Sequence, residues 1–440
     1  MSANYTIKIT YFPVPKQHLV GWCLDSPKDN ITATSQELSK VGIIFRGWVL
    51  AKESVNFSLV FLYSNSIEKI ELNIDRADVI RKILTNDPTG YEKIKCGFQK
   101  LIPLNCSAFS VGVLIDGNFF PLAKGKIEGM FKIIHGEGNW LFLDNDTNKS
   151  VEQYTGQVLL SWDEKRAWKS YVKDVLSLSE STATPTCLLI APSKEMVYPE
   201  YYPFQQAKKT PASQLEKLIP DKFDLIFPIN ELRSSEYRSY RKSDTHWSMH
   251  GARIASLLLF TSLTGIETDK VKIFDDDKYS SKNNAGDLGS KLYPSLRTKE
   301  DFLTSFHYRS LIQFDNQLPN FGRVIIFHCP TPVINSSLLL FGSSSAYSMF
   351  HYLSRLFKNV IFLHTAGNID PDVIDILKPD FICLQTNARF IVKAPVVGQS
   401  IQEYIQSKRA LVNSEQLKPI LKKNAIPPEL SNIVKYFESM

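Results

Sequence analysis

An Asp-x-His sequence and a run of three serines are the two segments of this sequence that could together do chemistry. Residues 242–247 read KSDTHW, and at this spacing the Asp244 carboxylate can orient the imidazole of His246 through Nδ1. The Nε2 atom is then free to act as a general base. In the alternative, Asp244 only caps the following helix and His246 is an ordinary half-buried residue. The tripeptide alone leaves both interpretations open.

The serine run follows a buried strand. Residues 338–348 read LLLFGSSSAYS, which predicts an apolar strand that runs through a glycine and the serines into a helix. A hydroxyl in such a turn lies at the carboxyl end of the strand, where open α/β sheets hold their ligands. The free N–H groups of the helix start could stabilise a developing oxyanion. The serines could equally serve only as caps of that helix.

Taken together, the two segments predict a Ser–His–Asp site, because a serine nucleophile needs a base and the base needs an acid that orients it. The serine run follows the histidine in the chain, and triads occur in several chain orders. Residues 342–346 also approach the nucleophile elbow of α/β-hydrolases. That fold places its histidine last, and His351 and His364 have no carboxylate in the expected order. We keep that fold as a minor alternative.

A metal site is the other chemistry to consider here. His246 and His250 lie four residues apart, as in a zincin helix, but that motif needs Glu directly after the first histidine. Trp247 occupies that position, and no cysteine or third histidine is near in sequence. The sequence also has no P-loop and no G-x-G-x-x-G motif. We therefore expect no metal and no bound cofactor.

Four segments resemble, in the same order, motifs of the alginate O-acetyltransferase family, whose catalytic domain is SGNH-hydrolase-like. The DTHW sequence of residues 244–247 is similar to the family's DHHW-type signature, and GNWLFL at residues 138–143 is similar to its opening GxxGWLFL motif. Residues 191–200 (APSKEMVYPE) are similar to its PxKxxVYPE segment. Residues 378–390 (KPDFICLQTNARF) are similar to its closing kPDxV…ERf stretch. The resemblance covers roughly residues 130–395.

The resemblance implies a role for each member of the site. Aligned on Gly342, the family's nucleophile falls on Ser344, with Asp244 and His246 completing the triad. Ser343 stands where the family usually has Asp or Thr. The two serines beside Ser344 therefore stay open as alternative nucleophiles.

Five further side chains are expected to contact a sugar. Lys194 and Tyr198 follow a predicted strand end, Trp247 could wall the site against water, and Ser343 lies in the serine run. Arg389 closes the family's last motif, although the residues before it, NA, lack the usual acidic side chain. The sequence would look the same if these residues were ordinary turn residues with no role in binding.

The elements around these residues predict two domains. Residues 1–129 read as a β-sandwich, because short runs such as GIIFRGWVL at 42–50 alternate with turn residues. In residues 130–440, short apolar runs such as CLLIA at 187–191 alternate with helical spacing, which is typical of an α/β fold with a doubly wound parallel sheet. Residues 267–319 are polar and predict an insertion or lid.

The first domain has a resemblance of its own. The pairs Gly-Trp at 21–22 and 47–48, RADV at 76–79 and CGF at 96–98 resemble the small β-sandwich found next to some bacterial polysaccharide glycosyltransferases. This resemblance implies a cytoplasmic setting of capsule or O-antigen assembly, with glycan-assembly enzymes as partners at the membrane surface. The alternative is a purely structural sandwich with core tryptophans.

Charge and composition limit the classes of partner and the location that we expect. The net charge of +6 comes from 51 basic and 45 acidic residues with no Lys/Arg block, so we expect no nucleic acid. The start, MSANYTIKIT, lacks the features of a secretory signal, and no run of about 18 apolar residues predicts a membrane span. Six cysteines without a CxxC pair fit reduced thiols. We expect a cytoplasmic protein, with a peripheral position at the inner membrane left open.

Three functions remain at this point. The main prediction is O-acyl, specifically O-acetyl, transfer to a bacterial surface polysaccharide or its precursor, with acetyl-CoA as the expected donor in the cytoplasm. The second is a carbohydrate esterase, a deacetylase with the same triad and water as acceptor. The third is a non-catalytic glycan-binding module, against which the intact Asp-x-His and serine run argue.

Overall fold

The computed structural model divides the chain into two compact units. It describes residues 4–34, 37–63, 66–85, 87–89, 91–104, 106–129, 133–144, 146–411, 420–421 and 426–440. Unit 1 comprises Met1–Lys132 and Asp287–Arg297, and unit 2 comprises Ile133–Gly286 and Thr298–Met440. The first division lies three residues beyond the expected boundary after residue 129. The segment Asp287–Arg297, which we expected inside an insertion of the second domain, belongs to unit 1.

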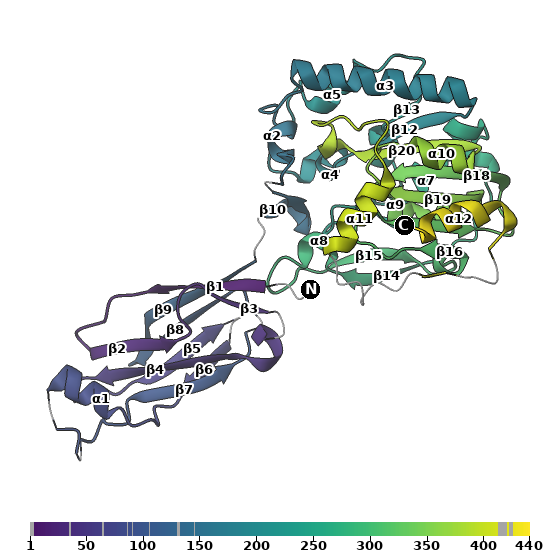
Figure 1. Cartoon of the computed structure of the whole chain (residues 1–440). Coiled ribbons are helices and arrows are strands. Elements are labelled where there is room, and N and C mark those ends of the chain that lie inside the picture. The colour runs from purple at the N-terminus through teal and green to yellow at the C-terminus, as the bar shows by residue number, and fades with distance from the viewer. Residues whose placement is uncertain are drawn as a thin grey trace. The chain divides into compact units, whose positions relative to one another are not determined.

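Unit 1 has two antiparallel sheets, of order β3-β1-β9-β8-β5-β6 and β2-β4-β7 (Figure 1). Apolar residues alternate along the strands, so one face of each sheet is buried. The rings of Phe61 and Phe109 lie 4.8 and 5.3 Å from that of Phe45 in this core. The strands are β1 (Asn4–Tyr11), β2 (Leu19–Ser26), β3 (Ile31–Thr34), β4 (Ile43–Ala51), β5 (Ser58–Tyr63), β6 (Ser66–Ile70), β7 (Gly97–Ile102), β8 (Ala108–Ile115) and β9 (Asn118–Gly129), with helical turns η1 (Glu37–Val41), α1 (Ala77–Val79) and η2 (Ile80–Leu84).

The sequence pairs that resemble the glycosyltransferase-associated sandwich have structural contacts here. The Trp48 ring packs on Gly21, where an added Cβ would lie 3.2 Å from it. Gly47 is needed for close strand packing, because a Cβ there would lie 2.2 Å from the carbonyl oxygen of Cys23. Arg76 forms an ion pair with Asp78 at 2.7 Å. The contacts of Gly21 and Gly47 pack strands of the sheet, whereas the ion pair of Arg76 and Asp78 is local, and none of these contacts indicates a partner.

Unit 2 is built on one mixed sheet of order β13-β12-β20-β18-β19-β17-β16-β21 within the described residues. The five strands from β13 to β19 are parallel to one another, whereas β17, β16 and β21 are each antiparallel to the neighbour before them. These strands are β12 (Thr186–Ala191), β13 (Leu225–Ile226), β16 (Ile312–Asp315), β17 (Val324–His328), β18 (Ile334–Gly342), β19 (Phe357–His364), β20 (Phe381–Asn387) and β21 (Ile420–Leu421).

The expectation of a wholly parallel sheet is therefore wrong for its last three strands. A continuous apolar run such as VIIFH in β17 is buried on both faces in either orientation, so the sequence pattern does not distinguish them. The link from β16 to β17, residues 316–323, is also too short for a crossover helix. Such a link favours antiparallel pairing.

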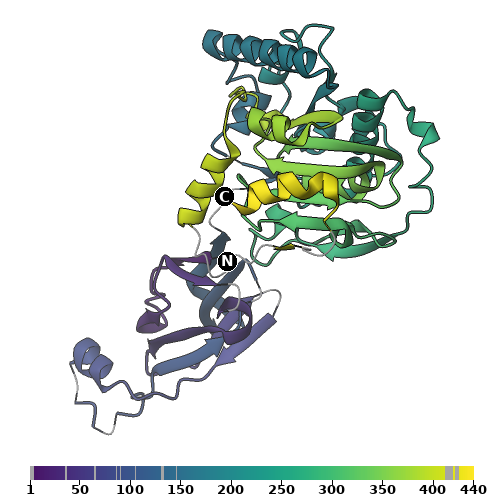
Figure 2. The ribbon, with the colours of Figure 1, turned by 45° about the vertical axis from the view of Figure 1, so that its right-hand side comes forward.

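Helices flank this sheet. α7 (Met249–Thr264) contacts β12 and α9 (Ala346–Leu356), α9 contacts β19, and α10 (Pro371–Leu377) contacts α12 (Ser431–Glu438). α10 and α12 lie in front of the sheet in both views (Figures 1 and 2). The other helices are α2 (Ser150–Tyr154), α3 (Trp162–Thr182), α4 (Lys194–Val197), α5 (Pro211–Glu216), α6 (Ile229–Arg233), α8 (Gly286–Gly289) and α11 (Ile401–Leu411), with turns η3 (Glu137–Asn139), η4 (Pro199–Tyr201), η5 (Thr268–Lys270), η6 (Tyr308–Leu311), η7 (Ala388–Phe390) and η10 (Pro428–Leu430).

Local sequence explains where the long helix α3 starts. Ser161 accepts the backbone N–H of Glu164, and the Glu164 carboxylate accepts that of Ser161, which makes a capping box. Trp168, Tyr171 and Val175 then form a buried stripe at helical spacing. Among the described residues, no helix is both long and apolar enough to cross a bilayer.

The expected insertion over residues 267–319 is not one irregular feature. It contains the hairpin of β14 (Tyr279–Asn284) and β15 (Thr298–Leu303), and it ends in β16 of the main sheet. Its polar composition suggested an irregular region because β14 reads YSSKNN and none of its residues is fully buried. Near the start of unit 2, β10 (Ile133–His135) and β11 (Leu141–Leu143) form a separate small sheet.

Candidate active site

Asp244 and His246 lie in the turn that leads into α7. The Asp244 carboxylate accepts hydrogen bonds from His246 at two places, 2.8 Å from the ring Nδ1 and 2.9 Å from the backbone N–H, both on Oδ1. The side chain that caps α7 is Ser248, which accepts the Gly251 N–H. Asp244 is therefore not the cap of α7, and the alternative that gave it this role is wrong.

Ser344 faces the other side of the same imidazole. Its Oγ lies 3.0 Å from His246 Nε2, in the turn between β18 and α9. Ser343 and Ser345 direct their hydroxyls elsewhere, to Asn387 at 3.1 and 2.8 Å. The geometry therefore places one of the three serines, Ser344, in line with His246 and Asp244.

The carboxylate of this line is held in its charged form. Burial alone would raise the pKa of Asp244, but the hydrogen bonds from His246 and the nearby positive charge of Arg241 lower it overall. Arg241 Nη1 lies 3.8 Å from Asp244 Oδ2, the oxygen that His246 does not use. A charged Asp244 keeps the proton of His246 on Nδ1 and leaves Nε2 to accept a proton from Ser344.

Lys194 fixes the backbone of this turn. Its side chain is only 3% exposed, and its Nζ donates to the carbonyl oxygens of Arg241, Lys242 and Asp244 at 3.1, 2.9 and 2.8 Å. An ammonium group has three N–H donors, so these three carbonyls use all of them. Lys194, which we expected to contact a sugar, lies here as a positioning residue for the Asp244 turn.

Trp247 and Tyr198 are also engaged within the protein. Trp247 is buried, and its indole N–H donates to the carbonyl of Ser345 at 2.9 Å, which ties the start of α7 to the serine turn. The Tyr198 hydroxyl accepts the backbone N–H of Ser239 at 2.9 Å, and its ring lies 4.8 Å from that of Trp140. Both side chains therefore hold backbone segments around the site in place.

The serine turn rests on amides at the end of β20. Gln385 Oε1 accepts the backbone N–H of Ser343 at 2.6 Å, which fixes the orientation of that amide because a backbone N–H can only donate. Gln385 Nε2 must then be the donor to Asn387 Oδ1, at 3.2 Å. The hydroxyls of Ser343 and Ser345 donate to the same Oδ1. The N–H₂ group of Asn387 is consequently turned away from these partners.

A small hollow lies beside the imidazole. It has an empty volume of about 310 Å³, part of it open to solvent, and is lined by His246, Ser345, Asn387 and Arg389, among others. We call it the acyl hollow. Arg389 is the one expected sugar-contacting side chain that lines it, whereas Ser343 is buried at 1% exposure in the hydrogen-bond network.

Two residues of this site were missed by the sequence analysis. Gln385 and Asn387 were read only as part of the segment that resembles the family's closing motif, KPDFICLQTNARF, and no role was given to either. The available signal was three polar residues at the carboxyl end of a buried strand, where ligands gather in α/β sheets. Their role depends on β20 lying next to β18, and strand order cannot be read from the sequence.

His250 has a separate structural environment. Its Nε2 lies 3.2 Å from the Asp301 carboxylate, and its ring lies 4.6 and 4.5 Å from those of Tyr237 and Tyr279. His250, the second histidine of the metal pattern considered above, thus links α7 to β15.

No protein-family model matches the sequence, and no curated protein does. Solved structures do match. PatB1 of Bacillus cereus with a sulfonyl adduct is 12% identical, with 62% of this chain and 98% of that chain covered and a TM-score of 0.46. The O-acetyltransferase domain of Pseudomonas putida AlgJ is 15% identical, with 63% and 99% covered and a TM-score of 0.39. A DHHW family protein from Eubacterium siraeum is 12% identical, with 63% and 98% covered and a TM-score of 0.39.

These matches confirm the expected likeness to DHHW-type proteins. At such low identities and TM-scores, they do not establish what this chain does. The activity has to follow from the geometry of the site itself.

Proposed function

We propose that this protein transfers an acyl group, specifically acetyl, to a hydroxyl of a carbohydrate through Ser344. The observation that carries this proposal is the hydrogen-bonded line from Asp244 Oδ1 through His246 to Ser344 Oγ, at 2.8 and 3.0 Å. This order of carboxylate, imidazole and hydroxyl activates serine for attack on a carbonyl carbon.

The reaction has two halves. Ser344 Oγ attacks the carbonyl of the acyl donor while His246 Nε2 takes the hydroxyl proton, and the same proton then passes to the leaving group. The product of this half is an acyl ester on Ser344. In the second half, His246 takes a proton from a sugar hydroxyl, whose oxygen attacks that ester, and returns it to Ser344 Oγ. The sugar leaves as an O-acyl ester and the serine is regenerated.

The negative charge of each tetrahedral intermediate needs donors beside Ser344. Asn387 supplies an N–H₂ group in the acyl hollow, because its Oδ1 is occupied by Gln385, Ser343 and Ser345. A second donor in this proposal is a backbone N–H of the serine turn other than that of Ser343, which donates to Gln385. Both are neutral and already oriented, which is the property that makes an oxyanion site effective.

The acceptor and the donor are less constrained than the triad. The carbohydrate acceptor is supported by the succession of sequence motifs that resemble the alginate O-acetyltransferase family, and a bacterial surface polysaccharide or its precursor is the acceptor that we propose. Acetyl-CoA is the proposed donor, and the proposed setting is the cytoplasm. Hydrolysis by the same residues, the esterase alternative, needs only water at the acceptor position.

Product analysis separates these outcomes. The full chain is incubated with acetyl-CoA or 4-nitrophenyl acetate, with and without oligosaccharide acceptors, and both free acetate and acetylated sugar are measured. We expect acetylated sugar, and loss of both products in Ser344→Ala. Acetate release that sugars do not change would identify an esterase. Unchanged turnover in Ser344→Ala would refute the site as assigned.

A further inference from the structure

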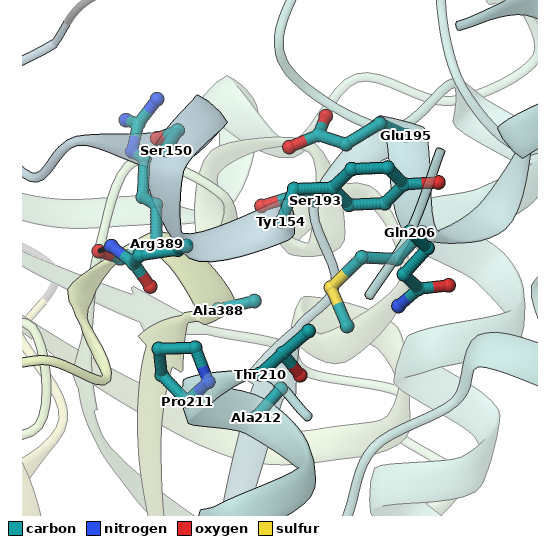
Figure 3. A pocket seen from close by; sticks show the side chains of 12 residues that line it. Ser150, Tyr154, Ser193, Glu195, Gln206, Thr210, Pro211, Ala212, Ala388 and Arg389 are labelled. Carbon is teal, nitrogen blue, oxygen red and sulfur yellow. Dashed lines mark hydrogen bonds between the residues drawn. The ribbon is translucent and has the colours of Figure 1, made fainter. Parts of the chain in front are cut away.

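The turn that carries Asp244 is closely packed on the side that Lys194 holds. A narrow hollow next to the acyl hollow is lined by Ser193 and Glu195, the residues on either side of Lys194, and by Arg389 (Figure 3). Its interior of about 30 Å³ has room for about two water molecules rather than a ligand. Further contacts of the Asp244 turn come from the hairpin of β14 and β15.

Glu300 of β15 is a buried carboxylate that bonds this turn. It is 1% exposed, and its Oε1 accepts the backbone N–H of Lys242 at 3.0 Å and the hydroxyl of Thr298 at 2.8 Å. Its Oε2 accepts from Arg238 Nη2 at 2.5 Å. A buried carboxylate is costly unless its oxygens are paired, and here both are. Lys242 is therefore held at its N–H by Glu300 and at its carbonyl by Lys194.

The same hairpin bonds the residue before Asp244. The Ser243 hydroxyl donates to the carbonyl of Asn284, the last residue of β14, at 3.1 Å. It also lies 2.8 Å from the hydroxyl of Thr298, the first residue of β15. Asn284 and Thr298 are paired across the hairpin, so both strands contact the turn at one level.

Gly286, two residues beyond β14, lies directly against the catalytic carboxylate. A Cβ at this position would lie 2.5 Å from the Ser243 carbonyl oxygen and 2.8 Å from Asp244 Oδ2. Gly286 also has a φ of +62°, a left-handed conformation that favours glycine. The close approach leaves Asp244 little space to move toward the hairpin.

We propose that the hairpin of β14 and β15 positions Asp244 for its bond to His246, with Glu300 as the main positioning residue, a proposal that rests on the function proposed above. The effect of Glu300 passes through the backbone of Lys242 to the carboxylate two residues further on. Small displacements of an orienting group reduce the rate strongly, because proton transfer depends on alignment. Part of the polar segment that the sequence suggested as a lid therefore supports the site.

Steady-state kinetics with 4-nitrophenyl acetate compares Glu300 with a matched carboxylate. Asp315 is also 1% exposed and is paired with an arginine, Arg323, at 2.8 Å, but it lies on β16. We expect Glu300→Gln to lower kcat about five- to twentyfold with little change in KM, because the amide places a donor where the carboxylate has an acceptor. Asp315→Asn should lower the melting temperature to a similar extent and keep its kcat. An unchanged kcat in Glu300→Gln, or an equal fall in both variants, would overturn the proposal.

Gly286→Ala tests the contact with the carboxylate itself. The added methyl displaces Asp244 or the Ser243 carbonyl, so we expect kcat to fall about tenfold. Gly265→Ala is the control, because Gly265 has a similar φ of +71° and an added Cβ there would meet nothing within 4 Å. This control carries similar backbone strain and should keep its kcat. An equal fall in both variants would assign the loss to backbone strain and contradict the proposed role of Gly286.

A spectroscopic measurement separates this proposal from the proposed function. The His246 Nδ1 proton resonates far downfield in the proton NMR spectrum while it is bonded to the Asp244 carboxylate, and its signal is assigned by its loss in His246→Gln. We expect the signal to move or broaden in Glu300→Gln and to persist in Asp315→Asn. An unchanged signal in Glu300→Gln would overturn the proposal. Because the measurement needs no turnover, the expected shift in a protein that transfers no acyl group would refute the proposed function alone.

Discussion

The two sides of the candidate site are positioned in different ways. On the base side, a single charged group, the Lys194 ammonium, holds three backbone carbonyls of the turn that carries Asp244. On the serine side, neutral amides of Gln385 and Asn387 hold the turn that carries Ser344 through several weaker bonds. The position of the Asp244 turn therefore depends mainly on one side chain, whereas the position of the Ser344 turn depends on several hydrogen bonds together.

The difference suits the charges that form during reaction. A positive group near the base side does not disturb a carboxylate that must stay ionised. Neutral donors on the serine side stabilise an oxyanion without binding an anionic leaving group as tightly as a fixed cation would. The following changes test whether the two sides differ in this way.

Removing a reacting group on either side should have the largest effect. Ser344→Ala and His246→Ala should each lower kcat by about 10⁴- to 10⁶-fold, because neither group acts without the other. The double variant should be no slower than the single variants, as measured by acetate release. Additive losses would mean that the two residues do not work as a unit.

Removing the proposed oxyanion donor should rank next. Asn387→Ala should lower kcat about 10²- to 10³-fold with little change in KM. Asn359→Ala is the matched control, since Asn359 is also buried but bonds His328 on β17. The control should lose stability and keep its kcat. A loss in Asn387→Ala that appears only in KM would assign that side chain to substrate binding instead.

Lys194→Met tests the single clamp on the base side. Three carbonyls lose their donor, so we expect about a 10²-fold lower kcat and a loss of about 3 kcal/mol in unfolding free energy by urea titration. Lys242→Met is the control, because Lys242 donates to one carbonyl, that of Gly138, in an exposed position. An unchanged kcat in Lys194→Met would show that the turn keeps its shape without the ammonium.

Trp247→Phe should have the smallest effect. It removes the hydrogen bond to the Ser345 carbonyl, the tie between the two sides, while keeping an aromatic ring in the core. We expect a cost of about 1 kcal/mol in unfolding free energy and a fall in kcat of about two- to fivefold. A fall as large as that of Lys194→Met would make this tie, and not the ammonium, the main positioning contact.

The sequence predicted the parts of the site whose position depends on local chain geometry. Asp244 and His246 are two residues apart, so their contact needs only a turn, and the strand–serine–helix succession around Ser344 is equally local. Gln385 and Asn387 could not be placed in the same way, because their contact with the serine turn depends on β20 pairing with β18.

The same dependence on long-range pairing separates the features of the fold that local sequence explains from those that it does not. The helix over Met249–Thr264 is explained by local sequence, because Ser248 caps its start and Ala252, Ala255 and Leu259 form a buried stripe at helical spacing. The orientation of β17 and the membership of Asp287–Arg297 in unit 1 depend on long-range pairing. Tyr293 packs against Tyr5 with ring centroids 5.0 Å apart, a contact between residues distant in sequence that no local pattern predicts.

The central claim is that Ser344, and neither neighbouring serine, carries the acyl group. The protein is mixed with 4-nitrophenyl acetate, quenched in acid within milliseconds to seconds, digested and mapped by tandem mass spectrometry. We predict one acetylated residue, Ser344, which disappears in Ser344→Ala and persists in Ser345→Ala. Acetyl on Ser343 or Ser345, or turnover with no acetylated serine in the wild-type protein, would contradict the account.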